Sequence, residues 1–595
     1  MALQKHLLND PATLVVDSLS GLCAVNNQLA FDPPNKVVYK ANLDRSKVAL
    51  VCGGGAGHEP SHAGFVGEGM LSAAVCGNVF ASPSTAQVRR GIDLVSNDAG
   101  TIILVKNYTG DVLNFGLAAE QYAAEHPDKS DKVKFIIVGD DVAVGRTQGG
   151  IVGRRGLAGV VLVYKIAGAL AAQGASLSEV YDIAQYTAGR IGTIGVGLEH
   201  CHVPGTAAEA HSISATEIEV GLGIHNEAGI KRVSPIPSLS ELIPTLLDYI
   251  TSTNDKERSY LTFKGDGKDE VALLVNNLGG MSELELGGVV RATREELASR
   301  KVVIKRVIAG TFMTSLNMPG FSISLVLLPR PEDANAPKAD FLLSLLDAPA
   351  QTPGWKHTSG APPITPTPLA PAASASSASK PASGIAAAAP DEYVAALQRI
   401  CNALVAAEPE ITRMDTIAGD GDCGLTLKAG AVSVLEDIEA GRIAGTDLVR
   451  DMVLVSKMAE TQMGGTSGAL YSIFFSALAQ GLSSAAGGTA SPASGTPEVW
   501  GSALTSALAK LYTYTRARPP SRTLVDPLDA FISSYSSSSS YDLAAAVKKA
   551  AAAAEETKNV EAKAGRSAYV DAGMLKREGV PDPGAWGVKT ILEAI

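Results

Sequence analysis

VALVCGGGAG, residues 48–57, is an apolar run that ends in a cluster of glycines. Runs of the same kind recur in the first half of the chain, at GTIILVKNYTGD (100–111), KVKFIIVGDDVAV (132–144), VALLVNNLGG (271–280) and KVVIKRVIAG (301–310). Short apolar runs that end in glycine or polar turns, with helix-like segments between them, are typical of α/β folds with at least partly parallel sheets. The sequence therefore predicts an α/β domain over residues 1–347, built as two lobes with a break near residues 190–200.

A change of composition ends this region. Residues 348–389 are dominated by proline, alanine and serine and carry little charge, so they are predicted to form an extended, mobile linker that buries no core. Beyond it, residues 390–595 contain segments with apolar residues at helical spacing, among them DEYVAALQRICNALVAAEP and TSGALYSIFFSALAQGL. We predict an all-α domain of about seven or eight helices there.

Properties of the whole chain limit the classes of partner and compartment. The formal net charge of −11 over 595 residues argues against binding of nucleic acid or anionic membrane, because phosphates require a basic surface. The six cysteines form no C-x-x-C pair, so neither a zinc site nor a disulfide framework is indicated. The sequence shows no secretory signal, targeting tail or long apolar run. We expect a cytoplasmic protein with no nucleic-acid partner and no membrane span.

A glycine-rich segment, GGGAGHEPSHAGFVGEGM (53–70), follows the first apolar run and carries His58, Glu59 and His62. Backbone N–H groups in such a segment can point at a bound oxygen atom. Its spacing matches neither the dinucleotide-binding pattern nor the P-loop pattern, so it does not indicate a nucleotide. Taken alone, the glycines fit a tight strand-to-helix turn as well as they fit a ligand-binding loop.

Two further segments carry polar side chains at comparable places. Lys106 and Asp111 in VKNYTGDVLNF stand at or just after the end of a predicted strand, where ligands gather in open α/β sheets. His225 stands among glycines and small apolar residues in EVGLGIHNEAG (219–229). Each segment also has an ordinary structural explanation, namely a surface lysine with a turn aspartate and a buried histidine bonded to a carbonyl. Because the loops could converge on one small polar molecule, we predict a joint site containing His58, Asp111 and His225.

Three aspartates cluster in the helical region. Asp415, Asp420 and Asp422 in RMDTIAGDGDCGLTLKAG lie around two glycines, and their mutual repulsion is costly unless a cation neutralises it. Carboxylate oxygens suit Mg²⁺, which usually keeps waters and substrate phosphates in the rest of its coordination shell. The spacing does not match a calcium-binding loop. The sequence therefore favours a metal site over a capping turn.

A glycine-rich helix start lies in QMGGTSGALY (462–471). Gly464, Gly465, Thr466 and Ser467 open a long apolar helical stretch, and a helix N-terminus offers free N–H groups that suit phosphate. An ordinary helix cap formed by Thr466 or Ser467 is the alternative. Next to three aspartates of metal-binding type, the phosphate-binding interpretation gains weight.

Taken in order, five segments resemble the dihydroxyacetone kinase family: GGGAGHEPSHAGFVGEGMLSAAVCGNVFASP, KNYTGDVLNF, GLGIHNEAG, GDGDCG and MGGTSGALY. The resemblance covers nearly the whole chain except the linker. It points to the single-chain, ATP-dependent kind, because members linked to phosphoenolpyruvate keep the two parts on separate chains. It implies a kinase that uses ATP and Mg²⁺ to phosphorylate dihydroxyacetone, and D-glyceraldehyde as well.

On the substrate side, the resemblance implies that His225 bonds covalently to the carbonyl carbon of the substrate as a hemiaminal. His58 is implied as a polar partner and proton acceptor, and Asp111 as the general base for the terminal hydroxyl. The positions that correspond to the family's substrate contacts are Gly55, Ala56, Gly57, His58, Lys106 and Asp111.

On the nucleotide side, the resemblance implies an α-helical barrel in which Asp415, Asp420 and Asp422 bind Mg²⁺. The family's members are commonly dimers, so a homodimer is expected. The positions that correspond to nucleotide or phosphate contacts are Asp422, Cys423, Gly424, Gly465, Thr466, Ser467, Arg522, Thr523, Asp582, Pro583 and Gly584.

One departure from the family pattern concerns the loop before Arg522. Family members usually carry a glycine and an acidic residue ahead of R-T-M-L-D, whereas this chain has Pro520 and Ser521 there and retains Arg522, Thr523 and Asp526. A proline removes a donor and fixes φ. The loop is therefore expected to have altered geometry, and weakened nucleotide affinity with retained activity stays open.

Two other functions remain open at this stage. The C-terminal domain could act as an FAD-AMP lyase (FMN cyclase) that converts FAD to riboflavin 4′,5′-cyclic phosphate, an activity of some members of the family. The chain could also be a non-catalytic carbonyl-binding regulator. The three aspartates and the glycine-rich helix start argue against this last reading.

Overall fold

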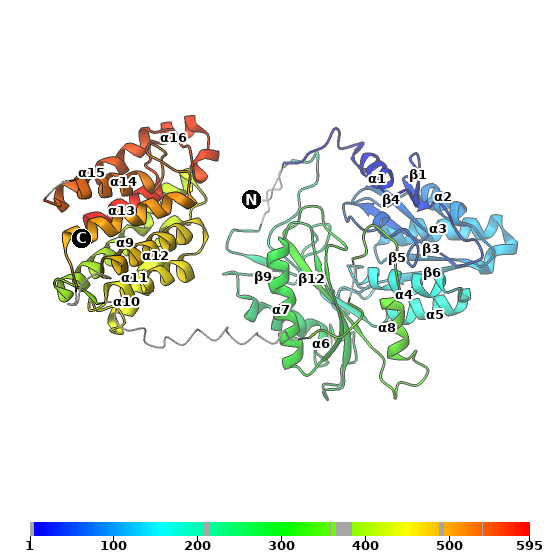
Figure 1. Cartoon of the computed structure of the whole chain (residues 1–595). Helices are drawn as coiled ribbons and strands as arrows, with labels where there is room; N and C mark the ends of the chain where they lie inside the picture. Colours follow the sequence, from blue (N-terminus) through cyan, green and yellow to red (C-terminus); the bar gives the residue numbers. More distant parts are fainter. Residues whose placement is uncertain (1–4, 208–212, 357–358, 365–383, 487–492, 538–539) are drawn as a thin grey trace. The chain divides into compact units, whose positions relative to one another are not determined.

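The computed structural model describes residues 5–207, 213–356, 359–364, 384–486, 493–537 and 540–595. The chain divides into two compact units, which we call the α/β unit (Met1–Thr367) and the helical unit (Pro368–Ile595) (Figure 1). The predicted fold class, a two-lobed α/β region followed by a helical region, is confirmed. None of the helices in the described ranges is long and apolar enough to cross a bilayer.

The first lobe of the α/β unit is a six-stranded sheet in the order β1-β2-β4-β3-β5-β6. Its central strands β3 (Ala49–Ala56), β4 (Ala73–Val79), β5 (Thr101–Lys106) and β6 (Val133–Val138) are parallel, and β1 (Leu29–Asp32) and β2 (Val37–Lys40) extend one edge in antiparallel pairing. Helices α2 (Thr85–Val95) and α3 (Thr109–Glu125) pack on one face. Helices α4 (Val160–Ala172) and α5 (Leu177–Ala188) pack on the other. The carboxyl ends of β3 and β5 therefore lie at one edge of the sheet.

The second lobe is a six-stranded sheet in the order β11-β10-β12-β7-β8-β9. It opens with β7 (Ile191–Gly197) and contains β8 (Ile218–Val220), β9 (Lys231–Val233), β10 (Glu270–Asn277), β11 (Val303–Gly310) and β12 (Gly320–Leu327). Only the β10–β11 pair is parallel within the described strands of this sheet. Helices α6 (Leu239–Thr251) and α7 (Glu283–Ser299) cover one face. Residues of the other face join the core that contains α4 and α8 (Ala339–Asp347).

The predicted linker over 348–389 is wrong at its start, where the chain is fastened to the α/β unit. Gln351 N donates to Glu68 O at 2.9 Å, and Gly354 N donates to Gly64 O at 2.7 Å. The Trp355 ring packs against Phe312 with ring centroids 5.7 Å apart. These backbone bonds and an aromatic contact outweigh the low-complexity composition. Residues 365–383 of the predicted linker lie outside the described residues.

The helical unit holds nine α-helices in its described residues, one more than the upper end of the prediction. They are α9 (Pro390–Ala418), α10 (Cys423–Glu439), α11 (Leu448–Met458), α12 (Gly465–Ala486), α13 (Pro497–Tyr514), α14 (Val525–Ser537), α15 (Leu543–Glu556), α16 (Ala572–Glu578) and α17 (Pro583–Glu593). Successive helices from α9 to α15 are neighbours, and α17 packs on both α15 and α9. The ring of helices is therefore closed around one apolar core. A short parallel pair, β13 (Ile385–Ala387) with β14 (Ala493–Gly495), is added to it.

Helix α4 offers a test of this packing in the α/β unit, because it is buried on all sides and its Gly168 lies against backbone. A Cβ atom on Gly168 would lie 2.4 Å from Met70 Cα, whereas one on Gly116 in α3 would meet no atom within 4 Å. We expect Gly168→Ala to destabilise the α/β unit by about 1–3 kcal/mol. Gly116→Ala is the matched control and should be neutral or stabilise by up to about 1 kcal/mol. Chemical denaturation of the full chain followed by circular dichroism measures both, and equal midpoints would contradict the packing described.

Candidate active site

The glycines at the end of β3 lie within the strand itself. The alternative explanation, a tight turn between strand and helix, would have placed them after the strand. A Cβ atom on Gly53 would lie 2.1 Å from Val75 O, and one on Gly55 would lie 2.8 Å from Ala81 N. Only glycine fits such close backbone approaches. Ala56 O accepts from Phe80 N at 2.9 Å, and Gly57 O accepts from Leu316 N at 2.7 Å. The predicted contacts Gly55, Ala56 and Gly57 thus form a rigid strip of backbone.

His58 lies directly after this strip and is fully buried. Its Nδ1 atom is 2.8 Å from the carbonyl oxygen of Thr314. Burial, followed by the charge of Lys106, lowers the pKa of His58 well below its usual value. Its Nε2 atom lies 3.1 Å from Nε2 of His225, although the two residues are 167 positions apart. The structure therefore brings these two predicted residues into direct contact.

His225 lies in the tight turn that follows β8. Its ring meets the rings of Phe80 and Tyr108 edge-on, with centroids 5.0 and 4.8 Å away. Its Nδ1 atom is 2.8 Å from Oε1 of Glu227, and its backbone N donates to Oε2 of the same carboxylate at 2.9 Å. Glu227 was not among the site residues predicted from the sequence. The available signal was a carboxylate two positions after a histidine within a glycine-rich turn.

Lys106 and Asp111 reach the site from the end of β5 and the first turn of α3, and both are buried. Burial lowers the pKa of Lys106, and the charge of Asp111 opposes that shift. Burial raises the pKa of Asp111, and the charge of Lys106 opposes it in turn. Among the described residues, Oδ1 of Asp111 has no hydrogen-bond partner. A buried acceptor of this kind is available for a ligand hydroxyl.

His62 supplies a second unpaired atom beside the same glycine strip. Its Nδ1 atom is 2.8 Å from the hydroxyl of Tyr164, which is 2.7 Å from Sγ of Cys52. Burial raises the pKa of Cys52 to about 12, so the thiol keeps its proton. The Nε2 atom of His62 has no hydrogen-bond partner within the described residues. A Cβ atom on Gly54 would lie 3.3 Å from this atom and 3.3 Å from Oδ2 of Asp111. Gly54 thus leaves room beside bare backbone for the unpaired Nε2 of His62 and for the carboxylate of Asp111.

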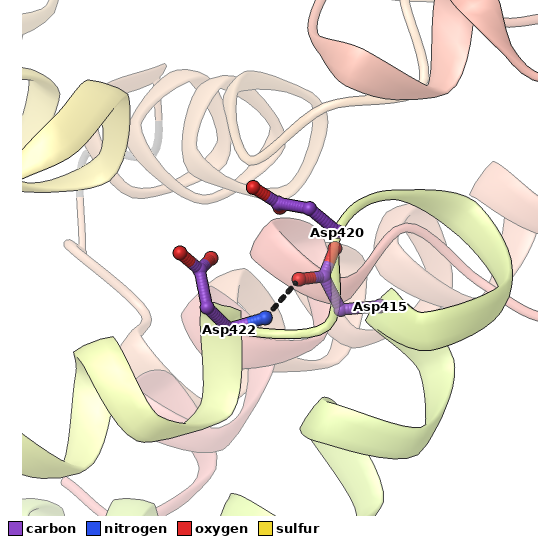
Figure 2. Close-up of side chains that lie close together, drawn as sticks. All are labelled: Asp415, Asp420 and Asp422. Carbon is purple, nitrogen blue, oxygen red and sulfur yellow. Dashed lines mark hydrogen bonds between the residues drawn. The ribbon is translucent and has the colours of Figure 1, made fainter. Parts of the chain in front are cut away.

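The predicted metal ligands come together in the helical unit. Figure 2 shows Asp415, Asp420 and Asp422 meeting at the turn between α9 and α10. One oxygen from each carboxylate lies within 4.8 Å of the others, and Asp415 is buried while the other two are exposed. Oδ2 of Asp415 accepts from the backbone N of Asp422 at 2.9 Å and from that of Cys423 at 3.0 Å. An all-oxygen set at this spacing fits a hard divalent cation.

A pocket of about 580 Å³ adjoins these aspartates and is lined by the first turn of α12. Gly464 and Gly465 have φ angles of 62° and 55°, and a Cβ on either would meet no atom within 4 Å. The predicted nucleotide contacts that line this pocket are Asp422, Cys423, Gly465, Thr466, Ser467, Thr523, Asp582, Pro583 and Gly584. Asp582 caps α17 by accepting from Ala585 N at 2.8 Å, and burial raises its pKa to about 7.

Two predicted nucleotide contacts are not brought to the wall of this pocket. Arg522 is buried, and its Nη1 and Nη2 atoms donate to the carbonyl oxygens of Thr557 and Val580 at 2.7 and 2.8 Å. A Cβ on Gly424 would lie 2.4 Å from Glu408 O, so this glycine permits close packing of α10 on α9. Both residues are accounted for by packing in the helical unit.

The loop with the unusual Pro520 and Ser521 is held by Asp526. Ser521 N and Thr523 N each donate to the Asp526 carboxylate at 2.8 Å, and Ser521 Oγ donates to it at 3.0 Å. Thr523 reaches the pocket, whereas neither Pro520 nor Ser521 lines it. Helix α14 therefore begins from a well-bonded turn despite the departure in sequence.

Comparison with known proteins agrees with this architecture. The chain matches the family model of the Dak1 domain over residues 20–354 and that of the DAK2 domain over residues 417–595. It is 43% identical to a dihydroxyacetone kinase of Pichia angusta, with 98% of this chain and 96% of that protein covered. A protein of Homo sapiens named triokinase/FMN cyclase is 38% identical, with 99% and 98% covered.

Solved structures match over the same extent. The dihydroxyacetone kinase of C. freundii in its native form superimposes with a TM-score of 0.64 at 31% identity, covering 100% of this chain and 99% of that one. The structure of that enzyme with AMP-PNP and Mg²⁺ gives the same TM-score at 30% identity and the same coverage. This chain belongs to the dihydroxyacetone kinase family.

Proposed function

We propose that this protein transfers the terminal phosphoryl group of ATP to dihydroxyacetone, and to D-glyceraldehyde as well. The observation that carries the proposal is the convergence of His58, Lys106, Asp111 and His225 from three separate segments, in a chain 43% identical to a dihydroxyacetone kinase. The α/β unit is assigned to the substrate and the helical unit to the nucleotide. We further propose a cytoplasmic homodimer that acts in glycerol metabolism.

Substrate capture is assigned to His225. Its Nε2 atom adds to the ketone carbon and forms a hemiaminal, and the edge-on rings of Phe80 and Tyr108 pack against the imidazole and help to orient it. His58, 3.1 Å away, exchanges a proton with the oxygen that was the carbonyl. Glycerol has no carbonyl carbon, so it cannot form this bond. A site built for a functional group rejects molecules that lack the group far better than it rejects a change in size.

Asp111 is assigned as the general base for the terminal hydroxyl. Its unpaired Oδ1 atom is ready to accept that hydroxyl, and its raised pKa makes it a stronger base than an exposed aspartate. Lys106 lies close enough for its charge to act on Asp111, which favours the ionised carboxylate and opposes the effect of burial. Nε2 of His62 offers a further hydrogen bond to a substrate oxygen beside Gly54.

The acidic cluster is assigned to Mg²⁺ and the adjoining pocket to ATP. Asp415, Asp420 and Asp422 fit the metal because they supply oxygens within 4.8 Å of one another. The metal, when bound, would neutralise charge on the nucleotide phosphates. Backbone N–H groups of Gly465, Thr466 and Ser467 at the start of α12 suit those phosphates, and the pocket also offers Thr523 and Asp582.

The assignment predicts different defects in two variants. His225→Ala removes the nucleophile, so kcat/KM for dihydroxyacetone should fall on the order of 10³-fold or more. Asp420→Ala removes a metal ligand, so kcat should fall and more Mg²⁺ should be needed. Coupled ATP turnover measures both. Asp391→Ala, an exposed carboxylate in the first turn of the same helix as Asp415, is the control and should behave as wild type. A wild-type KM in His225→Ala would contradict the proposal.

A second activity, cyclisation of FAD to riboflavin 4′,5′-cyclic phosphate, is favoured by 38% identity to a protein named triokinase/FMN cyclase. This reaction needs the metal-bearing helical unit and no ketone. We expect the full chain with His225→Ala to keep the wild-type rate of FMN cyclisation in FAD and Mn²⁺, and Asp420→Ala to lose it. Chromatographic detection of the cyclic product is the measurement. Absence of product from wild type would exclude this activity.

A further inference from the structure

The hydrogen bonds of His58 and His225 decide which nitrogen of each ring carries a proton. The Thr314 carbonyl can only accept, so Nδ1 of His58 is the donor in their 2.8 Å contact. Burial alone would raise the pKa of Glu227, but the hydrogen bond and charge of His225 outweigh it and lower the pKa to about 2. An ionised carboxylate also only accepts, so Nδ1 of His225 is the donor in the second contact.

A consequence follows for the two Nε2 atoms, which lie 3.1 Å apart. Because each ring uses its Nδ1 proton in one of these hydrogen bonds, two neutral rings would each have a lone pair on Nε2. The two lone pairs would face and repel each other. The contact is a hydrogen bond only when the pair holds one additional proton between the two Nε2 atoms. Burial and the charge of Lys106 disfavour this additional proton on His58, whereas the carboxylates of Asp111 and Glu227 act on the pair in the opposite sense. The form that holds the shared proton is the one that can protonate the substrate.

On the basis of the proposed function, we propose that Glu227 is the positioning residue for substrate capture. By accepting the Nδ1 proton of His225, it leaves the Nε2 lone pair as the nucleophile. The proton shared with His58 then passes to the carbonyl oxygen as the nitrogen–carbon bond forms.

The step balances in atoms and charge. The His225 Nε2 lone pair forms the N–C bond, the π pair of the C=O bond moves to oxygen, and that oxygen takes the proton from Nε2 of His58. His58 becomes neutral. His225, now substituted at Nε2 and still protonated at Nδ1, becomes an imidazolium whose positive charge faces ionised Glu227 at 2.8 Å. A charge-assisted hydrogen bond of this kind is about twice as strong as a neutral one, so Glu227 also stabilises the captured state.

The turn is shaped to bring this carboxylate to the ring. A Cβ on Gly223 would lie 2.0 Å from Oε2 of Glu227 and 2.6 Å from Nη1 of Arg155. Backbone bonds close the turn without the side chain, because Gly223 N donates to Glu227 O at 2.8 Å. The base of the turn is held separately, where Gly229 N donates to Oε1 of Glu219 at 2.7 Å. The absence of a side chain at position 223 therefore leaves room for the Glu227 carboxylate beside His225.

Two variants of the full-length protein test the role of Glu227. Glu227→Gln can present an N–H to His225 Nδ1 and so favour the Nε2–H form of the ring. Gly223→Ala displaces the Glu227 carboxylate without removing any polar group from the chain. Glu219→Gln is the matched control, because it alters a carboxylate that holds the same turn through Gly229 N and Arg232 Nε and makes no hydrogen bond with His225. Nitrogen-15 NMR of the histidine rings without substrate reports the protonated nitrogen, with the His225 signals assigned from His225→Ala.

We expect His225 to be protonated at Nδ1 in wild type and in Glu219→Gln, and to lose that form in Glu227→Gln and Gly223→Ala. In those two variants kcat/KM for dihydroxyacetone should fall on the order of 10²-fold, with a smaller fall in kcat. The ketone carbon-13 signal of labelled dihydroxyacetone, which disappears on capture by wild type, should persist. The pH profile of kcat/KM should also move, which loosening of the turn would not cause.

Three results would overturn the proposal. One is an unchanged Nδ1–H form of His225 in both variants. Another is a changed ring with undiminished capture of the labelled ketone. The third is a Glu219→Gln control that loses capture as Glu227→Gln does, which would assign the effect to the turn as a whole. Wild-type protein that shows the Nδ1–H form but captures no labelled ketone would instead overturn the proposed function.

Discussion

The substrate side depends on a strand end that carries no side chains. Gly53 and Gly55 admit the backbone of Val75 and Ala81 at distances that exclude any Cβ atom. Gly54 leaves its surface bare, so polar groups from β5, α3 and the His62 segment crowd beside it. A larger residue at any of these positions would displace either a neighbouring strand or the groups that bind substrate. The glycines thus set both the packing of the sheet and the position of the chemistry.

The two candidate sites solve opposite electrostatic problems. Ketone capture requires a nucleophilic lone pair on His225, and the burial of His58 and Lys106 disfavours their charged forms, so His58 readily gives up a proton that it shares. Cation binding requires a concentration of negative charge. Asp420 and Asp422 are exposed, so water reduces the repulsion between their carboxylates when no metal is bound. Asp415 is the exception, because two backbone N–H groups stabilise its buried carboxylate. Each environment suits the chemistry proposed for it.

The sequence predicted those features that local pattern determines. Apolar runs identified the sheets, and the strand-end position placed Lys106 and Asp111 correctly. The sequence did not predict contacts between distant segments. Thr314, whose carbonyl oxygen orients His58, lies 256 positions away from His58 in the chain. Family resemblance assigned Gly424 and Arg522 to the nucleotide site by position, but neither lines the pocket. A motif does not record that Gly424 packs against α9 or that Arg522 donates to the carbonyl oxygens of Thr557 and Val580. Glu227 lies inside the GLGIHNEAG motif but was not predicted, because its importance comes from a 2.8 Å contact with His225.

The unusual Pro520–Ser521 pair shows how a motif can change while its structural role persists. The bonds that shape this turn end on Asp526, and they come from Ser521 N, Ser521 Oγ and Thr523 N. A proline at position 520 removes none of these hydrogen-bond donors, because each donor belongs to a later residue. Serine in place of the family's acidic residue also spares Asp526 a neighbouring like charge and contributes a hydroxyl donor. The geometry of the turn therefore depends on the retained aspartate, and this explains how Thr523 still reaches the pocket.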